Sequence, residues 1–193
     1  MQTAIQLVIG LGNPGTEYAA TRHNAGFWMM SILSQQYHFV LQKEKKFFGE
    51  CAITTNANQK NYWLVPTTFM NCSGQAVQAL VNFYKIPLDA VLIIHDELDL
   101  SPGDVKLKWG GGHAGHNGLR HIIEVLGSAN FWRLRVGIGH PGKREQVASF
   151  VLGVPNKQEL NDIQEALTKA SRIFPALFAG KFELAMHCLH NKE

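Results

Sequence analysis

The sequence predicts a single-domain α/β fold, a three-layer sandwich in which helices flank a mixed, largely parallel and twisted sheet. Short apolar segments rich in β-branched residues alternate along the chain with longer segments of helical spacing. The length of 193 residues suits one domain, and a hydrophobic content of 46% allows a sizeable core. No repeat or low-complexity tract divides the chain, so we expect one domain over residues 1–193.

In the first half of the chain, an apolar segment at residues 4–11 ends in glycine and predicts a buried strand. Residues 23–37 carry an apolar face at helical spacing. Residues 48–55 and 61–65 flank a polar Asn/Gln/Lys turn, which predicts a hairpin. Residues 73–84 again have helical spacing, and Ser73 is expected to cap that helix.

The second half of the chain continues the alternation. Apolar runs predict buried strands at residues 91–95, 105–109 and 134–138. Helical spacing predicts a helix at 116–126, which Gly127 stops, and further helices at 157–177 and 182–189. Strands and helices in this order favour helices packed on both faces of one sheet.

Composition excludes several classes of protein. The longest apolar runs are far too short to span a bilayer, and no basic segment leads into an apolar one near Met1, so neither a membrane partner nor a signal peptide is expected. The cysteines Cys51, Cys72 and Cys188 form no CxxC pair, which argues against a disulfide framework and a zinc knuckle. A reducing cytoplasm is the simplest compartment.

The basic residues are unevenly distributed. The net charge is only +3, but many cations fall between residues 104 and 144. They are Lys106, Lys108, Arg120, Arg133, Arg135, Lys143 and Arg144. We expect this stretch to lie near the phosphates of a nucleic acid, although on composition alone a solvated surface explains the pattern equally well.

Polar residues follow three of the expected strands. Asn13 follows the first, Asp96 follows the strand at 91–95, and His140 follows the strand at 134–138. Ligands of open α/β sheets bind outside the carboxyl ends of the strands. The loops at that edge are therefore where we expect the chemistry.

The segment from Gly10 to Gly15 has the spacing G-x-G-x-x-G of a dinucleotide-binding loop. A true fingerprint opens directly into a helix and is followed by an acidic residue about 20 positions later. Here Pro14 interrupts the segment, and no acidic residue occurs between Glu17 and Glu44. We therefore interpret these glycines as a tight turn that presents the Asn13 side chain.

A metal site and a cysteine nucleophile are both conceivable. His95, Asp96, His113 and His116 are the candidate metal ligands. Their neighbouring glycines predict a mobile loop instead of one rigid helical face, so we expect no metal. Cys72 stands beside a helix start, where an isolated cysteine is more often structural.

Water activation without a metal is the favoured chemistry. A histidine can accept a proton near neutral pH if an acidic residue fixes its tautomer and amides hold the developing oxyanion. His23 is the candidate base and Asp96 the candidate acidic partner. Asn13, Asn71 and Asn117 supply the amides.

Six motifs together resemble those of bacterial peptidyl-tRNA hydrolases. They are GLGNPG at 10–15, YAATRHNAG at 18–26, PTTFMNCSG at 66–74, HDELD at 95–99, GGGHAGHNG at 110–118 and RLRVGIGHPG at 133–142. The resemblance runs from residue 5 to residue 153, and Cys72 and Ala114 vary at positions outside the catalytic set. The last forty residues carry no motif of this kind.

The resemblance implies a role for each matching position. His23 would be the catalytic base, Asp96 its orienting partner, and Asn13 the residue that separates peptidyl-tRNA from free aminoacyl-tRNA. Substrate contacts are implied for Tyr18, Phe69, Met70, Asn71, His116 and Asn117. Lys108 and Arg135 resemble a clamp on the tRNA 5′-phosphate.

The implied enzyme is a cytoplasmic monomer that needs no cofactor and binds peptidyl-tRNA, a nucleic acid, without reading its sequence. Two other functions remain open on the residues alone. One is an RNA-binding module without activity, which would bind tRNA tightly and cleave no ester. The other is a metal hydrolase of small esters, which a chelator would inhibit.

Overall fold

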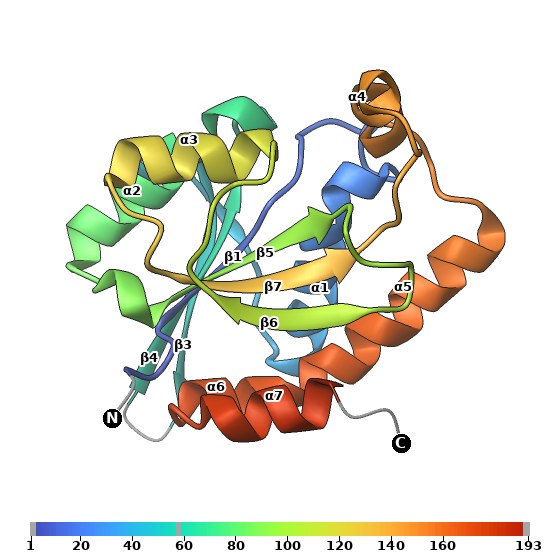
Figure 1. The fold of residues 1–193 in the computed structure, drawn as a ribbon. Coiled ribbons are helices and arrows are strands. Elements are labelled where there is room, and N and C mark those ends of the chain that lie inside the picture. The colour runs from blue at the N-terminus through green and yellow to red at the C-terminus, as the bar shows by residue number, and fades with distance from the viewer. Residues whose placement is uncertain (1–2, 57–58, 191–193) are drawn as a thin grey trace.

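The computed structural model describes residues 3–56 and 59–190, and a seven-stranded sheet forms its centre (Figure 1). The order across the sheet is β2-β3-β4-β1-β5-β7-β6. The strands are β1 (Leu7–Gly10), β2 (Gln42–Glu44), β3 (Gly49–Asn56), β4 (Gln59–Pro66), β5 (Val91–Glu97), β6 (Val105–Trp109) and β7 (Trp132–Gly137).

The central strands β4, β1, β5 and β7 run parallel to one another. Antiparallel strands complete the sheet, with β3 and β2 on one side and β6 on the other. The predicted fold class, a mixed and largely parallel sheet flanked by helices, is confirmed.

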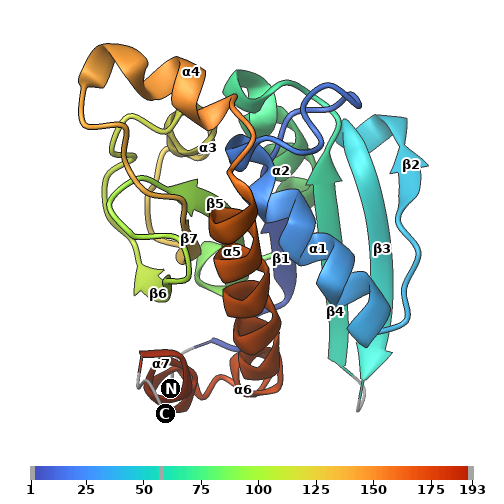
Figure 2. The same cartoon turned by 90° about the vertical axis from the view of Figure 1, so that its right-hand side faces the viewer.

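Helices cover both faces of the sheet. They are α1 (Ala25–Gln36), α2 (Ser73–Tyr84), α3 (Asn117–Leu126), α4 (Val147–Val151), α5 (Lys157–Ala170), α6 (Phe174–Phe178) and α7 (Phe182–His190). Short 3-10 turns are η1 (Arg22–Asn24), η2 (Lys45–Phe47), η3 (Met70–Cys72), η4 (Leu88–Ala90), η5 (Arg144–Gln146) and η6 (Ser171–Ile173). Figure 1 shows α2 and α3 together on one face, and Figure 2 shows α1 and α5 on the other.

Alternating side chains of the central strands divide the core into two layers. Val8 of β1 packs with α1, α5 and the C-terminal helices, whereas Leu7 and Ile9 pack with α2 and α3. All three side chains are fully buried. A strand covered on both faces must be apolar at every position, and this is why the segment at 4–11 reads as a continuous apolar run.

The strand at 105–109 was predicted to be buried, and that prediction is wrong. β6 is an edge strand in which Val105 and Leu107 are buried while Lys106, Lys108 and Trp109 are exposed. Its alternation of apolar and basic residues is typical of a strand with one solvated face. As a result, its two lysines face solvent.

Two further predictions need correction, and two short elements were not predicted. Ser73 does not cap α2 but is its first residue, and its hydroxyl donates to the Met70 carbonyl oxygen. The helix predicted at 157–177 is broken into α5, η6 and α6. β2 and α4 were missed because each is too short to show a period. The tip of the predicted hairpin turn, residues 57–58, lies outside the described residues.

The glycines of the dinucleotide-like segment serve helix packing. A side chain at Gly10 would overlap the carbonyl oxygen of Gly26, and one at Gly26 would overlap the backbone of Leu11. These glycines therefore let α1 lie directly against the end of β1. In the part of the chain that the structure describes, no helix combines the length and apolar character needed to cross a bilayer.

Candidate functional site

A cleft of about 510 Å³ lies at the carboxyl edge of the parallel strands. Figure 1 shows α4 beyond the arrowheads of β5 and β7. Of the residues predicted for the site, His23, Asp96, Lys108, His116, Asn117 and Arg135 line this cleft. The cleft therefore lies at the sheet edge where the chemistry was expected.

His23 and Asp96 form a buried hydrogen-bonded pair. His23 lies in η1, and its Nδ1 is 2.9 Å from Oδ1 and 3.0 Å from Oδ2 of Asp96, in β5. Because a carboxylate only accepts hydrogen bonds, Nδ1 carries the proton and donates it, which leaves the lone pair on Nε2. Burial lowers the pKa of His23, but the charge and hydrogen bond of Asp96 outweigh burial, so the pKa lies above its ordinary value of 6.5.

A second imidazole holds the other side of Asp96. His116 Nε2 donates to Asp96 Oδ1 over 2.9 Å, while its Nδ1 accepts from the backbone N–H groups of Gly118 and Leu119. His116 thereby caps α3 and fixes its own tautomer at the same time. Burial alone would raise the pKa of Asp96, but His23 and His116 hold that pKa well below its usual range. Asp96 is thus a carboxylate pinned between two donors.

The four residues considered for a metal site do not come together. His95 is buried, its Nδ1 donates to the Asp96 carbonyl oxygen, and burial lowers its pKa to about 3. His113 makes a local contact in which its Nδ1 accepts from the Gly115 N–H. Within the described residues, the grouping whose ligand atoms could hold an ion is His23, Asp96 and His116, with those atoms within 4.8 Å of one another.

Asn13 is clamped by Asn24, a residue that the sequence did not single out. The Asn24 side chain accepts from the Asn13 N–H over 2.8 Å and donates to its carbonyl oxygen over 3.0 Å. Asn13 Oδ1 in turn accepts from the Met70 N–H over 2.7 Å. These contacts fix the amide orientation and leave Asn13 Nδ2 without a partner among the described residues. The Asn13 Nδ2 group is therefore the donor available to a ligand.

Met70, for which the resemblance implied a substrate contact, does not line the cleft. Its side chain is buried in the core between the sheet and α2–α3, and its contribution to the site is the backbone N–H that orients Asn13. Next to it, Phe69 is 56% exposed and meets the ring of Tyr18 edge-on at 6.2 Å. Asn71 is exposed on η3. The predicted Tyr18, Phe69 and Asn71 thus gather beside Asn13, outside the lining of the 510 Å³ cleft.

The basic residues of the cleft differ in how far they are neutralised. Arg135 Nε donates to Glu97 Oε2 over 2.8 Å. Arg133 is buried and donates to the carbonyl oxygens of Gly111 and Gly112, and burial, followed by the charge of Arg135, lowers its pKa. Lys108 lines the cleft, and none of the described residues forms an ion pair with it. Lys108 is therefore available to meet an added anion, as is Arg144, which also lines the cleft and forms no ion pair with a described residue.

Part of the cleft lining is apolar, a feature that was not predicted from the sequence. Leu98, Leu119 and three residues of α4 contribute to it, namely Val147, Ala148 and Val151. Apolar walls with a few fixed polar groups are typical of sites for small organic groups. The cleft can therefore accept an apolar group next to His23.

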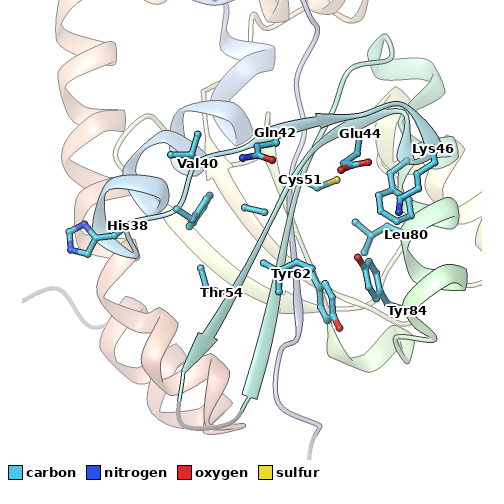
Figure 3. A pocket seen from close by; sticks show the side chains of 14 residues that line it. His38, Val40, Gln42, Glu44, Lys46, Cys51, Thr54, Tyr62, Leu80 and Tyr84 are labelled. Atoms are coloured by element: carbon cyan, nitrogen blue, oxygen red, sulfur yellow. The ribbon is translucent and has the colours of Figure 1, made fainter.

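A second hollow, of about 470 Å³, lies over β2, β3 and β4 and contains none of these groups (Figure 3). Tyr62 and Tyr84 lie side by side there, with ring centroids 4.3 Å apart. Burial raises the pKa of the Cys51 thiol to about 12, so this cysteine is not a nucleophile at neutral pH. The cleft at His23 is consequently the better candidate for catalysis.

Comparison with known proteins identifies the relatives of this chain. A family described as "Peptidyl-tRNA hydrolase" matches residues 7–193. A protein of that name from Ruthia magnifica is 51% identical over 98% of this chain and 99% of its own length. One from Neisseria meningitidis is 49% identical over the full length of both chains. The crystal structure of peptidyl-tRNA hydrolase from Acinetobacter baumannii has a TM-score of 0.94 at 44% identity and covers 98% of this chain and 96% of its own.

Proposed function

The chain belongs to the peptidyl-tRNA hydrolase family and is a hydrolase of peptidyl-tRNA, and from this premise we propose a mechanism in which His23 activates water. The observation that carries the proposal is the buried His23–Asp96 pair, which leaves the His23 Nε2 lone pair available at the cleft. The proposed route uses no metal and no cofactor. The proposed setting is a cytoplasmic monomer.

In the proposed reaction, His23 Nε2 removes a proton from water while the water oxygen attacks the ester carbonyl carbon. Asp96 stabilises the imidazolium that forms. The tetrahedral intermediate then collapses, the bond to the ribose oxygen breaks, and the imidazolium returns the proton to that oxygen. An ester bond is cleaved more readily than an amide bond. One positioned base and a few amide donors therefore suffice to hydrolyse the ester of peptidyl-tRNA.

The asparagine side chains have separate roles in the proposed mechanism. Asn117 opens α3 next to His116, so its side chain lies where a donor could meet the oxyanion. Asn13 Nδ2 is the fixed donor for the first peptide carbonyl, a group that a free aminoacyl ester lacks. Phe69 and Tyr18 offer exposed aromatic surface on which the terminal base can stack, and Asn71 adds a hydrogen-bonding group beside them.

The function is tested by incubating the protein with N-acetyl-aminoacyl-tRNA and, in parallel, with free aminoacyl-tRNA. Each incubation is run with and without a chelator. We expect rapid release of the blocked amino acid and little release of the free one. Asn13→Ala should reduce the difference in cleavage rate between the two substrates, because the donor to the peptide carbonyl is lost. Tight tRNA binding without cleavage would support the RNA-binding module, and inhibition by the chelator would support the metal hydrolase.

Lys108→Ala is expected to weaken binding of intact peptidyl-tRNA and to lower the slope of log K against log salt by about 1, because one phosphate contact is lost. Cleavage of a short N-acetyl-aminoacyl-nucleotide should be unchanged. Lys181→Ala, at an exposed lysine next to α7, is the matched control. An equal loss of activity on intact peptidyl-tRNA and on the short nucleotide substrate would refute the role of Lys108 in binding phosphate. Arg135→Ala is a poorer test, because it also leaves Glu97 unpaired.

A further inference from the structure

Arg22 joins the residue next to the proposed base to a segment far away in sequence. The Arg22 backbone N–H donates to the Gly153 carbonyl oxygen over 3.1 Å. Its guanidinium Nη1 lies 3.3 Å from the carbonyl oxygens of both Phe150 and Val154, to which it donates. Three carbonyl groups of one short segment therefore converge on this arginine.

Charge and stacking strengthen the same connection. Arg22 Nη2 forms an ion pair with Glu159 Oε2 at 2.8 Å, and the guanidinium lies over the Phe150 ring, 4.2 Å from its centroid. Glu159 also accepts from the Asn156 N–H and so completes the capping box that begins α5. Arg22 is itself only 8% exposed, so the ion pair is shielded on its side from solvent.

The segment held in this way carries one wall of the cleft. Val147, Ala148 and Val151 of α4 line the cleft, Phe150 belongs to the same helix, and Gly153 follows it. α4 packs on η1, the 3-10 turn that contains both Arg22 and His23. Displacing the wall relative to His23 therefore requires breaking the contacts of Arg22.

We propose that Arg22 is a positioning residue that holds the α4 wall against the catalytic turn, so that the apolar side of the cleft is already formed when the acyl group of the substrate arrives. A preformed wall binds the acyl group without first being ordered, and this lowers the cost of binding. The inference rests on the proposed function, because it assigns the acyl group to this wall. The base itself does not depend on Arg22, since His23 takes its orientation from Asp96.

The test is steady-state kinetics of Arg22→Gln and Arg22→Lys on N-acetyl-aminoacyl-tRNA and on a short N-acetyl-aminoacyl-nucleotide. For Arg22→Gln we expect KM to rise roughly tenfold on both substrates, while kcat changes by less than about twofold. The pH at which kcat falls should not move, because the His23–Asp96 pair is untouched. Arg22→Lys, which keeps the charge toward Glu159, should recover part of the KM.

Amide hydrogen exchange supplies a second measurement. Exchange at residues 147–154 should be faster in Arg22→Gln than in the unsubstituted protein, and exchange in α1 should be unchanged. Glu159→Gln keeps an acceptor for the α5 capping box but removes the ion pair, so it should show a smaller change of the same kind. Arg172→Gln, at an exposed arginine in η6, is the matched control.

An unchanged KM in Arg22→Gln, with the unsubstituted protein active, would overturn the inference and leave the proposed function standing. A fall in kcat with a displaced pH profile would also overturn it, because Arg22 would then act on the base. If Arg22→Gln does not fold, Arg22→Lys and Glu159→Gln decide the matter by the same KM criterion. Failure of the unsubstituted protein to cleave either substrate would instead refute the proposed function.

Discussion

Replacing His23 by alanine is expected to lower kcat/KM on N-acetyl-aminoacyl-tRNA by about a thousandfold, within the range that a general base contributes. His23 is the histidine whose Nδ1–H is held by a carboxylate and whose Nε2 has no hydrogen-bond partner among the described residues. Without it, water must attack unassisted, although the amides and the tRNA contacts remain. Single-turnover cleavage measures the loss directly, since it separates the chemical step from product release.

The fold should survive this substitution, so the thermal transition is the accompanying measurement. His38→Ala is the matched control, because His38 is exposed beside the second hollow (Figure 3) and is not among the residues that line the cleft. We expect that control to retain full activity. Robust turnover by His23→Ala would show that another group removes the proton, and His116 would then be the first to examine.

The location of the site could be predicted from sequence because it depends on where strands end. Asn13 and Asp96 come at the ends of apolar runs, and parallel strands bring such ends to one edge. Asp96 is within β5 and not beyond it, a shift of two positions that does not move the edge. Apolar period and chain order were sufficient for this part of the prediction.

The contacts that orient the site could not be predicted in the same way. Asn24 holds Asn13, and Arg22 holds the end of α4 and the residues after it, through hydrogen bonds that span 11 residues in one case and 128 or more in the other. The ion pairing of the basic residues could not be predicted either, since Glu97 of a neighbouring strand neutralises Arg135. Such partners follow from strand register and helix packing, neither of which single-residue patterns specify.

Ala114 has a strained backbone conformation that could not be predicted from the sequence. Its φ is +47°, in the left-handed region, within the loop between the triple glycine and His116. A residue with a side chain pays about 1 kcal/mol for this conformation. The loop nevertheless has to turn sharply there, because His116 must both cap α3 and reach Asp96.

Asp96→Asn should reduce kcat by about a thousandfold, which is less than the roughly 10⁴-fold loss when a serine protease loses its orienting carboxylate. The carboxylate accepts from both His23 and His116, whereas an amide offers one accepting and one donating group. One of the two imidazoles must therefore lose its hydrogen bond or change tautomer. If His23 is the one affected, Nε2 becomes protonated and can no longer act as base.

The pH dependence makes this variant decisive. The Asp96 charge keeps the pKa of His23 above 6.5 against the opposing effect of burial, so without that charge burial dominates and the pKa falls. A base works only when neutral, and activity of the unsubstituted protein should decline as the pH falls through the raised pKa. The weak residual activity of Asp96→Asn should persist to lower pH.

The pH dependence of stability should also differ between the unsubstituted protein and Asp96→Asn. A histidine with a raised pKa adds stability that is fully present below its unfolded pKa of 6.5 and is lost as pH rises through the folded value. The Tm difference between the unsubstituted protein and Asp96→Asn should thus be larger near about pH 5.5 than near about pH 8. A parallel pH profile for the two proteins, or a Tm difference independent of pH, would mean that Asp96 does not set the charge of His23. The pair would then be a structural contact, and the orienting role proposed for Asp96 would have to be abandoned even if its substitution abolished activity.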